Sequence, residues 1–343
     1  MAAEPSAKEK AWVLFDRIVA DAAPDGEHTN PWVKVANGQL RYSPDYGTLI
    51  KLLGVPLHLN ADTRTGVPAL ALDVWISYEL RRAGFDSDAT WPRATHPRIL
   101  PASVANLLKT LPVKERSDLE ARLTKTGAVP GVTSASANIL GKNYLKQVDV
   151  IMTDWHTGPE LLISTKRMDS SYGKNAANRV EESYGDAKNL RLRHPLAALG
   201  FVFGLRSDIL HKEPDTAEWL VDLLGKLGRE DDAYHATCLV MIDYDDTVAV
   251  AADSGEDPED RLVAAGLESE PEVAEPLALS EPDIESTLAQ LPTVRIRSDA
   301  MPAHLTPERF LALMIERVLD ATPVNLHREA RRRRASAPTD NPG

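Results

Sequence analysis

The stretch that decides the fold reads QVDVIM over residues 147–152 and, after a short turn, LLISTKRM over residues 161–168. Both segments are mostly apolar and of strand length, and the turn residues HTGP lie between them at 156–159, so the pattern predicts a β-hairpin. Each strand carries a charged residue that its apolar pattern does not explain. Asp149 stands near the start of the first strand and Lys166 near the end of the second. A carboxylate and a lysine on adjacent strands can hold a magnesium ion and a water over one phosphodiester.

The segments on either side of the hairpin predict the rest of the sheet and its helices. A helix over about 69–83 precedes the hairpin, and Gly84 follows it at a C-cap position. A helix over about 176–191 and an apolar strand over 197–205 come after the hairpin. The order helix, strand, strand, helix, strand predicts an α/β fold with a mixed central β-sheet flanked by helices.

Composition and charge divide the chain further. The net charge is -12, but residues 253–285 alone hold twelve acidic residues against one arginine, so the remainder is close to neutral. That segment is rich in Pro and Glu, which predicts a mobile acidic insertion. The expected regions are an N-terminal helical and loop region (1–68), a core (69–252) with a helical insertion around 86–130, the acidic insertion (253–285), a C-terminal strand and helix packed on the core (286–327) and a disordered basic tail (328–343).

Bulk features exclude several classes of protein. The single Cys238 excludes an internal disulfide framework and a cysteine-based zinc site. No apolar run approaches the ~20 residues that span a bilayer, and the N-terminus lacks the layout of a signal peptide. We therefore expect a cytoplasmic protein with no membrane partner and no nucleotide cofactor.

Strand periodicity places the charged residues of the hairpin. Side chains alternate faces along a strand, so Ser164 and Lys166 are expected to share one face of the second strand. Lysine is rarely buried without a partner. The alternatives are that Lys166 emerges into solvent at the strand end and that Asp149 lies on the solvent side of an edge strand.

The hairpin with Asp149 and Ser164-Thr165-Lys166 resembles the core of the PD-(D/E)XK nuclease superfamily, which includes most type II restriction endonucleases. In that pattern an Asp lies on the second core strand and an acid-x-Lys triplet on the third. The acids bind magnesium, and the Lys orients or deprotonates the attacking water. This sequence departs from the pattern twice: Val148 stands in place of Pro, and Ser164 in place of Asp or Glu.

Some restriction endonucleases that carry Ser-x-Lys take the missing carboxylate from the following helix, where this chain has Glu181 and Glu182. At ~100° per residue, Glu181 lies about 80° from the centre of the predicted apolar face and Glu182 nearly opposite it. We therefore favour Glu181 over Glu182, with a solvated pair as the alternative. Glu79 resembles the Glu on the first helix of the superfamily, which supports the metal. The alternative is an ordinary helix-surface Glu beside Arg82.

The resemblance implies a Mg²⁺-dependent endonuclease of the restriction type that cleaves duplex DNA, and a homodimer because cutting both strands needs two sites. Asp149 and Glu181 would hold the metal, with Glu79 as a further candidate, while Lys166 positions the water and Ser164 hydrogen-bonds near it. The expected contacts to the DNA backbone are Arg167, Lys174, Arg179, Lys188, Arg191 and Arg193.

Two other functions remain open from the sequence. Ser164 in place of an acid also fits a catalytically inactive, nuclease-like subunit that binds DNA or protein. A serine hydrolase with Lys166 as the base of Ser164 is less favoured, because residues two apart on a strand project in parallel and no Gly-x-Ser-x-Gly turn is present.

Overall fold

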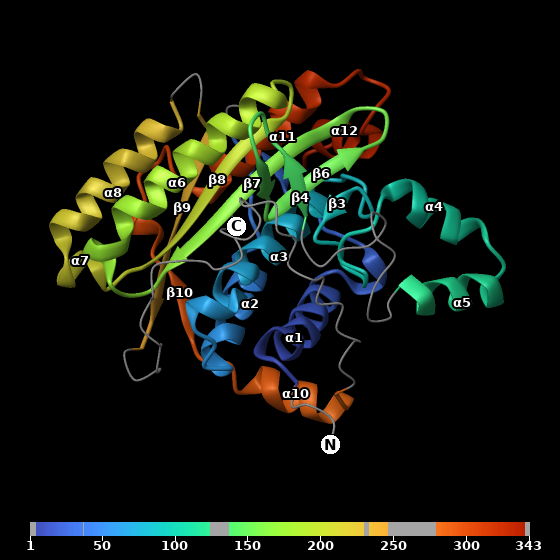
Figure 1. Ribbon diagram of the computed structural model, residues 1–343, viewed down its shortest axis with the longest axis horizontal. Coiled ribbons are helices and arrows are strands. Elements are labelled where there is room, and N and C mark those ends of the chain that lie inside the picture. The colour runs from blue at the N-terminus through green and yellow to red at the C-terminus, as the bar shows by residue number, and fades with distance from the viewer. Residues whose placement is uncertain (1–4, 37, 124–136, 230–232, 246–278, 340–343) are drawn as a thin grey trace.

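The computed structural model describes residues 5–36, 38–123, 137–229, 233–245 and 279–339, apart from the side chain of Lys174. Within these residues a six-stranded mixed sheet forms the centre, in the order β10-β9-β8-β7-β6-β3 (Figure 1). Its strands are β3 (Thr90–Trp91), β6 (Val150–Asp154), β7 (Gly158–Met168), β8 (Ala198–Arg206), β9 (Ala236–Tyr244) and β10 (Val294–Ile296). Two short antiparallel pairs lie outside it: β1 (Trp32–Lys34) with β2 (Leu40–Tyr42), and β4 (Asn138–Leu140) with β5 (Leu145–Gln147). The prediction of an α/β fold with a mixed sheet flanked by helices is confirmed.

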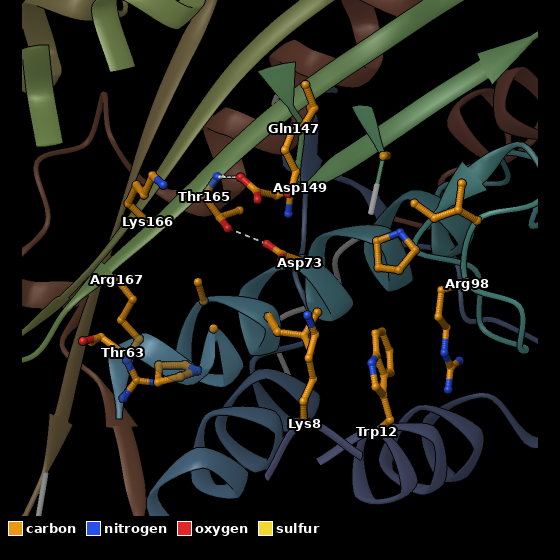
Figure 2. A pocket seen from close by; sticks show the side chains of 18 of the residues that line it. Lys8, Trp12, Thr63, Asp73, Arg98, Gln147, Asp149, Thr165, Lys166 and Arg167 are labelled. Atoms are coloured by element: carbon orange, nitrogen blue, oxygen red, sulfur yellow. Dashed lines mark hydrogen bonds between the residues drawn. The ribbon is translucent and has the colours of Figure 1, made fainter. Parts of the chain in front are cut away.

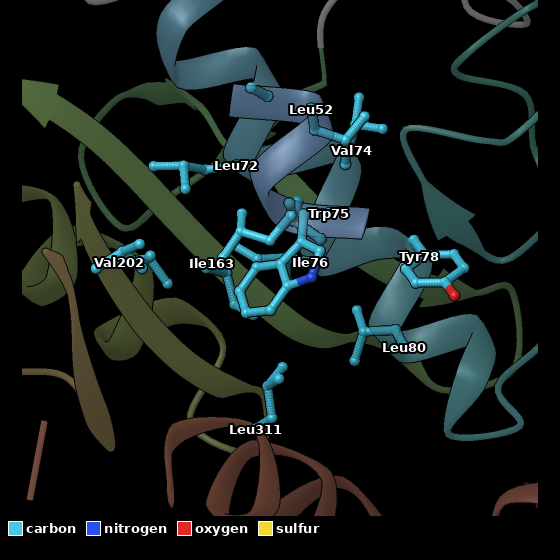
Figure 3. Packing of buried hydrophobic residues seen from close by; sticks show 14 of the residues in the cluster. Leu52, Leu72, Val74, Trp75, Ile76, Tyr78, Leu80, Ile163, Val202 and Leu311 are labelled. Atoms are coloured by element: carbon cyan, nitrogen blue, oxygen red, sulfur yellow. The ribbon is translucent and has the colours of Figure 1, made fainter. Parts of the chain in front are cut away.

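Helices cover both faces of this sheet. They are α1 (Ala7–Ala22), α2 (Tyr46–His58), α3 (Val67–Arg82), α4 (Ala102–Thr110), α5 (Val113–Leu123), α6 (Tyr172–Arg193), α7 (Ile209–Lys212), α8 (Pro214–Leu227), α10 (Glu281–Ala289), α11 (Pro307–Ala321) and α12 (Arg328–Ala335), with the 3-10 turns η1 (Pro24–Gly26), η2 (Thr63–Thr65) and η3 (Ser298–Ala300). On one face, Trp75 of α3 packs in one cluster with Ile163 of β7 and Val202 of β8 (Figure 3). On the other, Val180 of α6 packs in a second cluster with Phe203 of β8.

Burial explains why the central strands read as continuous apolar runs. Every residue of β8 is buried, and β8 pairs in parallel with both β7 and β9. A parallel strand covered by helices on both faces has no solvent side for polar residues. The helix α6 provides the crossover that a parallel β7–β8 pair needs.

The predicted hairpin is present. β6 and β7 pair antiparallel, with Val150 opposite Ile163. The predicted C-cap is also present: Gly84 follows α3 with a φ of +97°, a left-handed conformation that favours glycine.

The expected region boundaries are only partly matched. α1 and α2, from the expected N-terminal region, share one apolar cluster with α3 and the sheet. α4 and α5 lie in the expected insertion and have a separate small cluster that includes Leu108 and Leu123. β10 and α11 pack on the core as expected. Of the acidic segment, residues 253–278 lie outside the described residues and the remainder enters α10.

The prediction of a disordered basic tail over 328–343 is wrong for its first eight residues. Residues 328–335 form α12, and its arginines donate to carbonyls at the ends of two other helices. Arg331 Nη2 donates to the Leu319 carbonyl of α11 (2.6 Å), and Arg333 Nη1 to the Arg82 carbonyl of α3 (2.8 Å). The last carbonyls of a helix lack partners within the helix, so these arginines fold back to satisfy them.

No helix in the described part of the chain is both long and apolar enough to cross a membrane.

Candidate active site

The candidate site lies where β7 extends past the end of β6. The β6–β7 ladder begins at Val150 and Ile163, so residues 164–168 of β7 pair with β8 on one side and not with β6 on the other. Asp149 directly precedes β6 at this point. Its Oδ2 accepts the Thr165 backbone N–H at 2.7 Å, so a carboxylate stands beside the strand where a continued ladder would lie.

A second carboxylate approaches the same residue from the helix layer. Asp73 is on α3 and is buried. Its Oδ1 accepts a hydrogen bond from the Thr165 hydroxyl (Figure 2). The backbone and the side chain of one strand residue therefore bring together carboxylates from two elements that are far apart in the sequence.

The electrostatics of the pair reflect this crowding. Burial, and after it the negative charge of Asp149, raises the pKa of Asp73 well above its ordinary value. The Thr165 hydrogen bond and the positive charges of Lys166 and Lys8 lower it by less. A cation placed between the two carboxylates would relieve their repulsion.

A cavity of about 130 Å³ lies beside the pair, and five of its seven charged lining side chains are basic. Lys166 follows Thr165 on β7 and lines the cavity, as Figure 2 shows. The other cationic lining residues are Lys8, Arg98, Arg167 and Arg179. The hairpin register thus brings Asp149 and Lys166 into one cavity, as the sequence pattern suggests.

Ser164 does not join them. It faces the opposite side of β7, where its side chain hydrogen-bonds to that of Tyr234. Alternation along the strand gives the reason: Thr165, between Ser164 and Lys166, is the residue whose side chain points at α3. By the same alternation Lys166 leaves β7 on the Ser164 side, beside the stretch of β7 that β6 does not cover, and it is one of the lining residues of the cavity.

Neither glutamate proposed as the second carboxylate lines the cavity. Glu181 and Glu182 are both exposed on α6, whose buried face includes Val180, Ser183 and Ala187. Glu181 therefore projects from the helix into solvent.

Glu79 is buried in a structural network. It forms an ion pair with Arg82 at 2.7 Å, and it accepts from the Tyr42 hydroxyl at 2.9 Å and from the Asp45 N–H at 2.7 Å. The pairing with Arg82 matches the alternative reading, but the side chain is wholly buried and not on the helix surface.

The expected DNA-contacting cations divide between two places. Arg167 and Arg179 are buried and line the cavity. Lys188 and Arg193 are exposed on α6, and Arg191 donates to the Ala233 carbonyl at 3.3 Å. Lys174 lies in α6, with its side chain outside the described residues.

Asp73 is the residue that sequence reasoning missed. Fourteen of the sixteen residues of α3 are buried, so no polar stripe marks the face that carries the site. The available signal was a lone carboxylate inside the apolar run ALALDVW at residues 69–75. An acid in that position needs a partner or a ligand.

The donor set fits a hard divalent cation. Two carboxylates that reach one residue match the usual protein contribution to magnesium, which keeps several waters and takes further oxygens from phosphate. Among the described residues no group of three or more His, Cys, Asp or Glu side chains could hold a metal ion. A third carboxylate at this site is therefore not available from them.

No family model matches the chain, and neither the curated proteins nor the solved structures give a significant match.

Proposed function

We propose that the chain is a Mg²⁺-dependent endonuclease that hydrolyses phosphodiester bonds of duplex DNA. The observation that carries the proposal is the convergence of Asp73 and Asp149 on Thr165, beside Lys166, in a cavity edged by cations. The sequence resemblance proposed the same metal with Asp149 and Glu181. Because Glu181 is exposed on α6 and does not line the cavity, Asp73 replaces it as the second carboxylate.

The chain's own residues would divide the work as follows. Asp73 and Asp149 would hold magnesium, which supplies positive charge to the phosphate oxygens when bound. Lys166 would orient the attacking water and offset the negative charge that develops on the phosphate. Thr165 positions both carboxylates through its N–H and its hydroxyl. Attack by the water oxygen on phosphorus breaks the bond to the 3′ oxygen and leaves a 5′-phosphate and a 3′-hydroxyl.

The distribution of cations supports a phosphate-bearing substrate. Phosphate contacts, not the whole-chain charge, determine where a nucleic acid backbone lies. Arg167 and Arg179 flank the carboxylates in the cavity. Two such sites are needed to cut both strands, so the proposal includes a homodimer. It also includes a cytoplasmic location.

The test is cleavage of a mixed panel of plasmid and phage DNA with Mg²⁺ and with EDTA. We expect discrete fragments from the wild type that disappear in EDTA and in the Asp149→Asn and Lys166→Ala variants. Lys226→Ala is the matched control, because Lys226 is an exposed lysine of α8 outside the cavity. Cleavage that survives in Lys166→Ala would contradict the assignment of the site.

A second function is favoured by one observation. Ser164 occupies the place of an acid in the motif and bonds to Tyr234, away from the cavity. A nuclease-like subunit that binds DNA or protein without cutting would lack the acid of the motif in this way. DNA binding without cleavage on any substrate, modified or unmodified, would favour it.

A further inference from the structure

Arg167 has binding capacity that its surroundings do not use. Its side chain is 1% exposed, and its Nε forms an ion pair with Asp169 at 2.9 Å. Neither Nη1 nor Nη2 has a hydrogen-bond partner among the described residues. Buried polar groups are nearly always hydrogen-bonded, and buried N–H groups without an acceptor are costly. These two terminal nitrogens therefore point to an anionic ligand.

The guanidinium lies in the cavity of the candidate active site. Figure 2 shows the Arg167 side chain running from β7 toward Thr63, on the connection between α2 and α3. Thr165 and Arg167 are two apart on β7 and share a face, so they are separated by ~6.6 Å along the strand. Arg167 thus stands beside the carboxylate pair and not on it.

The beginning of α3 lines the same part of the cavity. Gly66, Pro68 and Ala69 are lining residues, and Gly66, with a φ of +69°, is the N-cap of this sixteen-residue helix. The Val67 N–H donates to Thr65 Oγ1 at 3.3 Å and Pro68 has no N–H, so Ala69 is the first-turn residue whose N–H can meet a ligand. Helix N-termini present unpaired N–H groups and a positive dipole end. A Cβ at Gly66 would meet nothing within 4 Å, so the space on that side of the Gly66 backbone is open.

Along α3 and along β7, the subsite residues are offset by similar distances from the contact between Asp73 and Thr165. Asp73 contacts Thr165, and Ala69, one turn earlier on the same face of α3, lies ~6 Å back along the helix axis. Arg167 is displaced by a similar distance along β7. The step from the carboxylate pair to the Arg167 end therefore matches the step between neighbouring phosphates of one nucleic acid strand.

We propose that Arg167 and the first turn of α3 form an anion subsite for a phosphate group of the substrate, next to the phosphate that is hydrolysed. The planar fork of arginine matches phosphate geometry. The nature of this substrate, a DNA strand, rests on the proposed function. Arg167 is then a positioning residue that sets which phosphate meets the carboxylates.

The first test measures binding of inorganic phosphate by calorimetry without metal, so that no metal ion can bridge phosphate to the carboxylates. Ala69→Glu is the main variant, because a carboxylate in the first turn favours the helix but repels an anion. Arg167→Lys keeps the charge and removes the fork. The matched control is Arg206→Lys, a buried arginine of the neighbouring strand that pairs with Asp208 at 3.3 Å and lies outside the cavity.

We expect phosphate binding by the wild type and by Arg206→Lys, with affinity at least tenfold weaker in Ala69→Glu and Arg167→Lys. Equal affinity in the wild type and Ala69→Glu, or an adventitious weak affinity that all four proteins share, overturns the subsite. Thermal melting of each variant separates this result from a loss of folding.

The second test identifies the source of the phosphate by comparing circular plasmid with linear duplexes that carry a 5′-phosphate or a 5′-hydroxyl. A raised KM of Ala69→Glu on circular DNA, with kcat little changed, supports an internal phosphodiester. Cleavage confined to 5′-phosphorylated ends supports a terminal phosphate. If phosphate binds as expected but no DNA is cut, the proposed function fails alone. If DNA is cut and Ala69→Glu cuts it with unchanged kinetics, the subsite fails alone.

Discussion

At the scale of single residues, removing the charge of Asp73 should raise stability and lower activity. The folded protein holds this carboxylate buried beside Asp149, and both effects raise its pKa. In Asp73→Asn the amide oxygen still accepts from the Thr165 hydroxyl, while one negative charge is removed. Relief of burial and repulsion should raise the free energy of unfolding by about 1–2 kcal/mol, and DNA cleavage should fall by about 100-fold or more.

Urea unfolding and the plasmid assay, run on the same preparations, check this prediction. A loss of stability in Asp73→Asn would show that the carboxylate is there for structure. Unchanged cleavage would remove Asp73 from the site.

Glu79 provides the opposite case, a buried carboxylate that serves structure. It neutralises Arg82 and bonds to Tyr42 and to the Asp45 backbone. Glu79→Ala leaves a buried guanidinium unpaired and should cost about 3–5 kcal/mol. Affinity for Mn²⁺ as a magnesium substitute, measured by calorimetry on the protein that remains folded, should be unchanged. A matched Glu182→Ala variant changes an exposed residue of α6, so its free energy of unfolding should stay within about 0.5 kcal/mol of the wild-type value. A fall in metal affinity in Glu79→Ala would restore Glu79 as a metal-supporting residue.

At the scale of elements, α12 is held against the end of α3 by close backbone contact. A Cβ on Gly84 would lie 2.9 Å from the backbone nitrogen of Ala330, and Gly84 has a φ of +97°. Gly84→Ala should therefore lower the free energy of unfolding by about 2–4 kcal/mol, through backbone strain and through weaker docking of α12. Gly158→Ala is the control, since its φ is +70° but nothing lies within 4 Å of its Cβ. It should cost only the strain, about 1–2 kcal/mol. Equal losses in the two variants, by chemical denaturation, would mean that α12 contributes no stability through this contact.

Elements with a clear periodic signal were accessible from the sequence, and those defined by tertiary contacts were not. The strand predicted over 197–205, which is β8, and the hairpin that joins Asp149 to Lys166 follow from apolar runs and turn residues. Glu181 was misplaced because the buried face of α6 was inferred from its apolar residues, of which Ala177 and Tyr184 are exposed, while the polar Ser183 and Asn189 are buried. α12 reads as a solvated arginine run, because its partners are carbonyls at helix ends about 10 to 250 residues away along the chain. Asp73 was missed for the same reason: only the fold brings it to Thr165.

At the scale of the whole molecule, two histidines placed in different parts of the fold should make stability depend on pH. Burial and the charges of Arg81, Arg333 and Arg82 lower the pKa of His28 to about 4. Burial and the charges of Arg317 and Arg191 lower the pKa of His235 to about 3. His235 Nδ1 accepts the Leu199 N–H at 2.9 Å, which requires the neutral ring.

The sign of the dependence follows from these shifts. Both histidines have an ordinary value of 6.5 in the unfolded chain. As the pH falls from about 6.5 to about 4, the unfolded chain takes up protons at these positions and the folded chain does not, so stability is lost over this window. The total loss from the two should be about 1–2 kcal/mol, because both rings retain solvent contact that screens the charges.

Denaturant unfolding at a series of pH values between 4 and 7 measures this loss. The variant that combines His28→Phe with His235→Asn keeps the packing beside Tyr78 and an acceptor for the Leu199 N–H. Because it removes both titrations, its stability should vary less with pH in this window than that of the wild type, and the two curves should separate toward pH 4. If the double variant loses stability with falling pH as steeply as the wild type, carboxylates and not these histidines govern the acid limb. Arg317 of α11 and Arg333 of α12 would then have no part in setting the loss of stability at acid pH.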